Sequence, residues 1–273
     1  MDGLAPVTLA ELAEHAALQT RVDRKYVLPT SAARHFVSDL AGSARVLEIN
    51  GSRDFGYASV YFDTADLDCY RMAAHRRPMR FKVRTRTYVD SAQCWLEVKT
   101  RDRRGRTVKH RQAHDVDHRD HLTTAARAFV LEVLAAAAID VGPLDLRPAL
   151  VTEYRRATLY LPGDESRLTL DTGLVCRQDG AGAVLLPGRV VVETKTAFHA
   201  SAADRLLWRS GYRPTRISKY GTGIAALRPE LPATPWRPIL RHHPFTPDGA
   251  EPWDRPLPQH PHRHLTAAAR PAG

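Results

Sequence analysis

Charged side chains recur at every second position in several short stretches of this chain. Arg80, Lys82, Arg84 and Arg86 alternate with apolar residues and threonine. The same spacing recurs at residues 97–101, 167–171 and 193–195, and in shorter form at 21–25 and 109–111. A period of two is the strand period, so each stretch places its charges on one face of a sheet. Because cations dominate, that face repels itself unless water or an anion covers it.

The sequence lacks the usual backbone cradles for phosphate. It contains no G-x-x-x-x-G-K-[ST] loop, no G-x-G-x-x-G after a predicted strand and no G-x-S-x-G elbow. Arginine can instead grip two phosphate oxygens with its planar fork, and lysine supplies a compact charge. Inward-facing Arg and Lys side chains would therefore suit a chain of phosphates, and a solvent-exposed basic sheet surface is the alternative.

Few carboxylates interrupt the basic stretches. Glu193 and Glu97 each share a strand pattern with a lysine two positions later. A carboxylate that faces phosphate is repelled unless a divalent metal bridges the two, and Mg²⁺ or Mn²⁺ takes oxygen from both groups. Glu193 and Glu97 are therefore candidate metal ligands. Weaker candidates for the same role are Asp23 and Asp171.

The elements that must position these side chains are mainly strands. Period-two patterns and turn residues predict strands at 21–28, 57–62, 80–89, 93–101, 107–111, 150–161, 167–174 and 190–196. Helical spacing predicts helices at about 9–18, 31–40, 123–138 and 201–210, and a short one that ends near 227. Thr8 and Glu11 have the spacing of a capping box at the first of these helices. Many strands, few helices and tight turns indicate an α+β fold built on an antiparallel barrel or a strongly curved sheet.

Charge and composition restrict the partners. The 273 residues carry a net charge of +10, which indicates an anionic partner. Aromatic residues make up only 7% and are not interleaved with the basic stretches, so nucleic acid is disfavoured. Eleven of the 19 prolines lie beyond residue 228, together with several histidines. We therefore expect one domain at 1–228 and an unstructured Pro/His-rich tail at 229–273.

The cysteines and the hydropathy pattern indicate where the protein resides. Cys69, Cys94 and Cys176 are far apart in sequence, so buried reduced thiols are expected rather than a disulfide framework or a zinc site. The sequence has no apolar run of transmembrane length and no signal-peptide pattern. These features predict a soluble, cytoplasmic protein.

An ordered set of motifs resembles a known family. The motifs are Arg21–Tyr26, Tyr57–Thr64, Arg80–Arg86, Leu96–Arg101, Tyr154–Arg156, Arg167–Thr172, Val192–Lys195 and Ser218–Tyr220. Together they resemble the VTC domain, the catalytic part of the vacuolar transporter chaperone polyphosphate polymerases, over roughly residues 20–228. The resemblance implies a triphosphate tunnel metalloenzyme fold, which is an antiparallel eight-stranded tunnel flanked by helices. It also implies transfer of the γ-phosphate of ATP to inorganic polyphosphate with Mn²⁺ or Mg²⁺.

The resemblance and the alternating pattern together assign roles to particular residues. Phosphoryl transfer is expected from Arg80, Lys82, Arg84, Lys99 and Lys195. Substrate binding is expected from Lys25, Arg86, Arg101, Lys109, Arg156, Arg167 and Lys219. The metal is expected on Glu193, with assistance from Glu97. The partners are then ATP and polyphosphate, and a membrane partner that takes up the product stays open.

The chain departs from the wider superfamily in one motif. Triphosphatases of that superfamily often open with Glu-x-Glu-x-Lys, where this chain has Arg21, Asp23 and Lys25. Arg21 replaces a carboxylate that could bind a second metal, and its guanidinium could bind phosphate instead. Two other functions stay open: a triphosphatase acting on inorganic or organic triphosphates, and a non-catalytic polyanion-binding protein.

Overall fold

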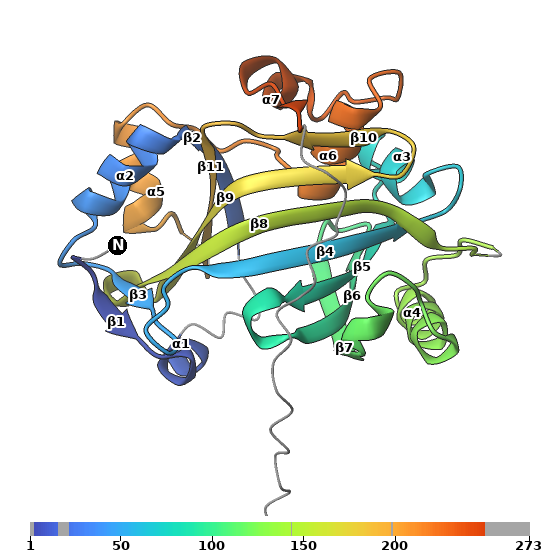
Figure 1. The fold of residues 1–273 in the computed structure, drawn as a ribbon, viewed down its shortest axis with the longest axis horizontal. Coiled ribbons are helices and arrows are strands. Elements are labelled where there is room, and N and C mark those ends of the chain that lie inside the picture. The colour runs from blue at the N-terminus through green and yellow to red at the C-terminus, as the bar shows by residue number, and fades with distance from the viewer. Residues whose placement is uncertain (1–2, 16–21, 143, 198, 249–273) are drawn as a thin grey trace, which may run out of the picture.

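A curved, mostly antiparallel sheet of 12 strands runs through the centre of the molecule, and helices flank it (Figure 1). The computed structural model describes residues 3–15, 22–142, 144–197 and 199–248. The eight longest strands among these residues are β2 (Val22–Pro29), β4 (Phe55–Asp63), β5 (Arg80–Tyr88), β6 (Gln93–Arg101), β7 (Thr107–His114), β8 (Arg147–Leu161), β9 (Ser166–Gln178) and β11 (Arg189–Thr196).

Shorter elements complete the fold. The remaining strands are β1 (Ala5–Val7), β3 (Arg45–Leu47), β10 (Gly182–Leu185) and β12 (Thr246–Pro247). The helices are α1 (Leu9–His15), α2 (Thr30–Asp39), α3 (Asp68–Ala74), α4 (Thr124–Ala136), α5 (Ala202–Arg209), α6 (Lys219–Leu227) and α7 (Arg237–His242). Single 3-10 turns lie at Val89–Ser91, Val116–His118 and Pro162–Asp164. The capping box predicted for α1 is confirmed, since the Thr8 backbone N–H donates to Glu11 at 2.8 Å and the Glu11 N–H donates to the Thr8 hydroxyl at 3.2 Å.

The eight longest strands form one hydrogen-bonded series. Its order is β7–β6–β5–β4–β8–β9–β11–β2, and every neighbouring pair in it is antiparallel. Among the described residues β2 and β7, at the two ends of the series, do not pair with each other. The antiparallel sheet with flanking helices is therefore as predicted, but the closed eight-stranded barrel is not found. β2 pairs only with β11 and β7 only with β6 in the described chain, so the series stays open between them.

Alternation along each strand separates the apolar core from the charges. On β5, Phe81 and Val83 are buried against a core that includes Val130 and Leu134 of α4. A second core joins Tyr26 and Val192 of β2 and β11 to the helices α2 and α5. Each fully buried aliphatic side chain contributes about 1.5–3 kcal/mol to folding. Because the helices bury one face of these strands, the charged residues lie on the other face.

The C-terminal part of the described chain differs from the prediction. Residues 229–248, expected in an unstructured tail, include α7 and β12, and Trp236 and Ile239 are buried in the core. A Cβ atom at Gly221 of α6 would lie 2.1 Å from the Trp236 ring, so the indole packs directly on that helix. The proline-rich composition gave no indication of this contact, because the contact depends on tertiary packing. The rest of the expected tail, 249–273, lies outside the described residues.

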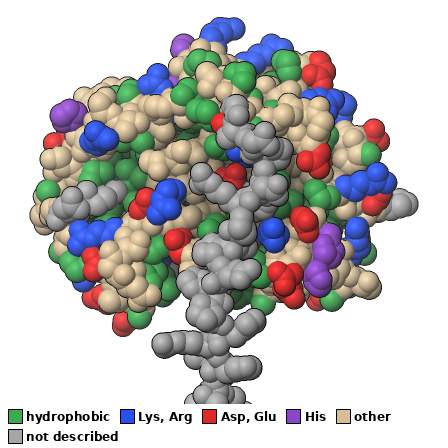
Figure 2. All heavy atoms as spheres, viewed as in Figure 1, with side chains coloured by type: hydrophobic (Ala, Val, Ile, Leu, Met, Phe, Trp, Pro, Cys, Tyr) green, Lys and Arg blue, Asp and Glu red, His purple; other side chains and the backbone are tan. Residues whose placement is uncertain are grey.

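The cysteines, the hydropathy of the helices and the surface charge can each be compared with the predictions. Cys69, Cys94 and Cys176 are buried free thiols, as predicted. In the described part of the chain no helix combines the length and apolar character needed to span a membrane. On the molecular face shown in Figure 2, basic and acidic side chains are interspersed.

Candidate functional site

The register of β5, β6 and β7 brings basic residues together across the strands. Arg80 pairs with Arg101, Lys82 with Lys99, and Arg84 with Glu97. On the next strand, Lys109 lies opposite Lys99. Same-face residues that oppose each other across strands have Cβ atoms about 5 Å apart. These side chains therefore form a dense ladder of charge with one carboxylate inside it.

The strands at the other end of the series present a matching set of charges. Lys25 of β2 lies opposite Glu193 of β11, and Lys195 of β11 lies opposite both Asp23 and Arg167. Arg156 of β8 pairs in register with Asp171 of β9. We call the sheet face that carries the residues of both ends the charged face. Its members are Asp23, Lys25, Arg80, Lys82, Arg84, Arg86, Glu97, Lys99, Arg101, Lys109, Arg156, Arg167, Asp171, Glu193 and Lys195, joined by Lys219 of α6.

The two ends of the strand series influence each other across the charged face. Burial, together with the charges of Lys99 and of Lys25 on β2, lowers the pKa of Lys82 on β5 to about 7. Burial also lowers the pKa of Lys99 on β6, and Asp23 of β2 acts on it in the opposite direction. Because β2 and β6 are far apart in the hydrogen-bonded order, these couplings require the sheet to curve its charged face inward.

Each of three carboxylates on this face is held by cations. Glu97 accepts from Arg84 Nη2 at 2.5 Å and from Lys109 Nζ at 3.0 Å, and it is 3% exposed. Burial raises the pKa of Glu97, but Arg84, Arg86 and Lys109 outweigh it and hold that pKa well below its usual range. A lowered pKa makes this carboxylate a weak base.

Asp171 and Glu193 are held in the same way. Asp171 accepts from Arg156 Nε at 2.6 Å and also from the Lys219 ammonium. Glu193 faces Lys25 Nζ at 2.8 Å and Lys195 Nζ at 3.3 Å. Burial opposes ionisation of both carboxyls, yet the neighbouring cations leave the pKa of each far below its ordinary value.

Tyrosines line the charged face between the basic side chains. Arg84 donates to the Tyr61 hydroxyl at 2.9 Å, and Arg86 donates to the Tyr154 hydroxyl at 3.3 Å. The Lys219 ammonium lies 4.2 Å from the centre of the Tyr154 ring. Sequence analysis did not assign Tyr57 or Tyr154 a role. The sequence did contain an indication that these tyrosines share a face of their strand, because Tyr57 and Tyr61 have the same period-two spacing as the cations.

The helix α6 brings two further groups to this face. Ser218 caps the helix by accepting from the Gly221 N–H at 3.1 Å, and its hydroxyl also accepts from Lys82 Nζ at 2.9 Å. The Tyr220 hydroxyl donates to the buried carboxylate of Asp63, which also accepts from the Cys69 and Tyr70 N–H groups of α3. Lys219 is therefore presented from a helix fixed at both its cap and its first turn.

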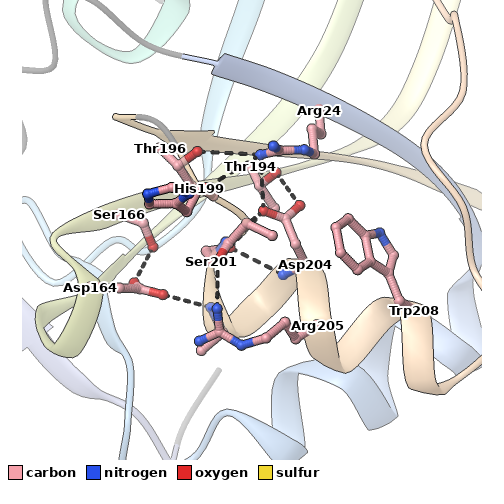
Figure 3. A network of polar contacts seen from close by, with 12 residues as sticks. Arg24, Asp164, Ser166, Thr194, Thr196, His199, Ser201, Asp204, Arg205 and Trp208 are labelled. Atoms are coloured by element: carbon pink, nitrogen blue, oxygen red, sulfur yellow. Dashed lines mark hydrogen bonds and ion pairs between the residues drawn. The ribbon is translucent and has the colours of Figure 1, made fainter.

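A buried network on the opposite face of β2 and β11 holds these two strands in place (Figure 3). Asp204 of α5 is 0% exposed and accepts from Tyr26 of β2 and Thr194 of β11, each at 2.6 Å. Its other oxygen accepts from the Ser201 N–H at 2.8 Å, which completes a capping box. Tyr26 and Thr194 are the direct sequence neighbours of Lys25 and Glu193, so the network positions both residues from behind.

Some predicted residues lie at the margins of the charged face. Arg80 Nη1 donates to the Arg77 carbonyl at 2.5 Å, and Arg167 Nη2 donates to the Leu12 carbonyl at 2.9 Å. The Arg101 guanidinium packs against the turn at Gly105, where a Cβ atom would lie 3.0 Å from it. These three arginines therefore border the more central residues. Arg21 lies outside the described residues.

Mg²⁺ and Mn²⁺ bind oxygen donors, and the carboxylates of the charged face differ in how well they could serve as ligands. Within the described ranges, no group of three or more His, Cys, Asp or Glu side chains could hold a metal ion. Mg²⁺ typically needs only one or two carboxylates together with substrate phosphates. Glu193 fits this requirement because its partners are lysines. Their flexible side chains can leave the carboxylate and form ion pairs with phosphate instead. Glu97 fits less well, because the Arg84 guanidinium donates two hydrogen bonds to one of its oxygens, from Nε and from Nη2.

Comparison with known proteins gives one family match and several distant structural likenesses. Among solved structures, the putative adenylyl cyclase HpAC1 from Hippeastrum is 19% identical, with 78% of this chain and 99% of that chain covered and a TM-score of 0.46. A putative adenylate cyclase from Bacillus halodurans is 14% identical, with 73% and 94% covered and a TM-score of 0.47. A search of curated proteins finds no significant match.

The family match covers most of the chain and spans the strands of the charged face. The VTC domain model matches residues 20–228, which include β2 through α6. The match agrees with the resemblance found in the ordered motifs. The chain belongs to the VTC domain family.

Proposed function

We propose that this chain is a polyphosphate polymerase that transfers the γ-phosphate of ATP to a growing inorganic polyphosphate chain on the charged face. The observation that carries the proposal is the convergence of Arg and Lys from strands at both ends of the series on one face. These cations outnumber the carboxylates among them, and the carboxylates are already paired. A linear polyanion would neutralise the excess along its whole length.

The state of the carboxylates favours phosphate over water as the acceptor. Attack by water needs a base to take its proton, and the lowered pKa values of Glu97, Asp171 and Glu193 make these groups poor bases. A terminal phosphate oxygen is already largely deprotonated near neutral pH, because its second pKa is about 6. Transfer between phosphates therefore asks the protein only to position the groups and to stabilise their charge.

The roles of individual residues follow from their places on this face. Arg84 and Arg156 are oriented by Glu97 and Asp171, so their remaining N–H groups would hold phosphate oxygens in fixed positions. Lys25 and Lys195 would move from Glu193 toward the ligand. Mg²⁺ or Mn²⁺, shared between Glu193 and phosphate, would supply further neutralisation of the developing charge.

The proposal is tested by incubating the purified protein with ATP and Mn²⁺ and separating the products by chain length. We expect long phosphate chains from the wild type. The Glu193→Gln variant should lose metal-dependent synthesis, whereas Glu132→Gln, on the exposed surface of α4, should retain it.

The other products distinguish the alternatives. Release of free phosphate without chain growth would indicate a triphosphatase. Tight polyphosphate binding without any turnover of ATP would indicate a polyanion-binding protein.

A further inference from the structure

The chemistry of the charged face changes from one end of the β5–β6 hairpin to the other. The cross-strand pairs, in order, are Arg80–Arg101, Lys82–Lys99, Arg84–Glu97, Arg86–Trp95 and Tyr88–Gln93. The first two pairs contain only cations, the third joins Arg84 to a carboxylate, and aromatic rings enter at the last two. A ligand with a phosphate chain at one end and a planar group at the other would match this gradient in one orientation only.

Trp95 is the central aromatic group at that end. The Arg111 guanidinium carbon lies 4.6 Å from the centre of its indole ring, which stacks a planar cation on the aromatic face. The cross-strand neighbour of Trp95 on β7 is Ala113, an exposed residue with a minimal side chain. Arg111, two residues away on the same strand, lies over the indole, and Ala113 places only a methyl group directly opposite Trp95.

Tyrosines extend the aromatic surface beyond Trp95. Tyr88 is its diagonal neighbour in the β5–β6 register, a separation that aromatic side chains can bridge. Tyr88 packs edge-on against Tyr57 with ring centres 5.1 Å apart, and Tyr57 stacks on Tyr154 at 5.4 Å. The aromatic end of the charged face therefore includes residues from β4, β5, β6 and β8.

We propose that this aromatic end, centred on Trp95, binds the nucleobase of the nucleoside triphosphate donor. The phosphates then point along the hairpin toward Arg84 and Lys82. Successive pairs are two residues apart, about 7 Å along a strand, which leaves room for a ribose between the base at Trp95 and phosphates at the next pair. This inference rests on the proposed function, and it defines the donor as a nucleotide rather than an inorganic triphosphate.

Binding measurements on three proteins test the inference. The wild type, Ala113→Leu and His110→Leu are titrated with ATP and with inorganic tripolyphosphate by calorimetry. Leucine at position 113 would crowd the space beside the indole, whereas exposed His110 lies on the other face of the same edge strand and serves as the control. We expect Ala113→Leu to weaken ATP binding by about tenfold, as loss of base stacking does, and to leave tripolyphosphate binding unchanged. His110→Leu should change neither affinity.

Further results separate this inference from the proposed function. Trp95→Leu should likewise remove the preference for ATP over tripolyphosphate while circular dichroism shows a folded protein. Equal losses of affinity for both ligands, or no loss in either variant, would overturn the base-binding role and leave the polymerase proposal standing. A wild type that binds neither ligand would overturn both.

Discussion

At the scale of single residues, Lys82 is a cation whose pKa depends strongly on its surroundings. It lies between Lys99 in the register of the hairpin and Ser218 of α6, whose hydroxyl accepts from it at 2.9 Å. No carboxylate among the described residues forms an ion pair with it, in contrast to Lys25 or Lys109. Its ammonium form is therefore disfavoured in the absence of ligand and is stabilised when phosphate binds.

This property predicts a pH dependence of polyphosphate binding. Burial, with the nearby lysines and arginines, lowers the pKa of Lys82 to about 7, so the free protein loses this proton as the pH rises through 7. Bound phosphate favours the ammonium and raises that pKa, so binding takes up a proton and weakens as the pH rises. The affinity should fall by up to about tenfold per pH unit above 7.

The measurement is the Kd for long-chain polyphosphate between pH 6.5 and 8.5 in metal-free buffer. Lys82→Arg is the matched control, because a guanidinium stays charged throughout this range and should flatten the dependence. Identical slopes for the wild type and the variant would show that Lys82 is not the titrating group.

At the scale of elements, α5 fixes the two strands that present Lys25 and Glu193. Asp204 receives hydrogen bonds from both strands and from its own helix cap, so one carboxylate connects β2, β11 and α5. Trp208 adds a hydrogen bond from its indole N–H to the Tyr26 hydroxyl at 3.0 Å. The charged face is therefore supported by a polar network on the opposite side of the same strands.

Weakening this network should affect stability and binding together. Asp204→Asn keeps one acceptor oxygen but replaces the other with an amide that cannot accept from Ser201. We expect it to lower the free energy of unfolding by about 2 kcal/mol and to weaken polyphosphate binding. Thr194→Val removes a single donor and should cost about 1 kcal/mol. Urea denaturation measures both, and an Asp204→Asn variant as stable as the wild type would contradict the role of the network.

The elements also show how far the sequence determines the fold. The β5–β6 and β8–β9 hairpins were predictable, because alternation and short turns are local properties of the chain. Helix α3 was not, because the carboxylate of Asp63 caps its first backbone N–H groups across an intervening turn. Within the site, too, local patterns were predictable and contacts between distant elements were not. Alternation predicted which cations share a face, whereas the contact between Lys219 and Asp171 depends on how α6 packs against β9.

At the scale of the whole molecule, the open seam between β2 and β7 is consistent with the excess of positive charge. A small closed barrel is just wide enough for its own side chains. Here long cationic side chains occupy the charged face, and burying them without counter-charge would cost several kcal/mol for each group. The polyanion proposed above would supply this counter-charge.

The matched family region ends at residue 228, yet the packing of the molecule continues to residue 248. Trp236 is 4% exposed and packs on Gly221, and Ile239 joins the same core, so this segment supports the helix that carries Ser218 and Lys219.

A chain that ends at Arg228 should lose much of its stability, because removing a buried tryptophan alone costs about 3–5 kcal/mol. A chain that ends at Asp248 retains every described contact and should melt at the temperature of the full chain. Thermal unfolding of both, with and without polyphosphate, measures the difference. Equal melting temperatures would mean that α6 holds its position without the segment that follows it.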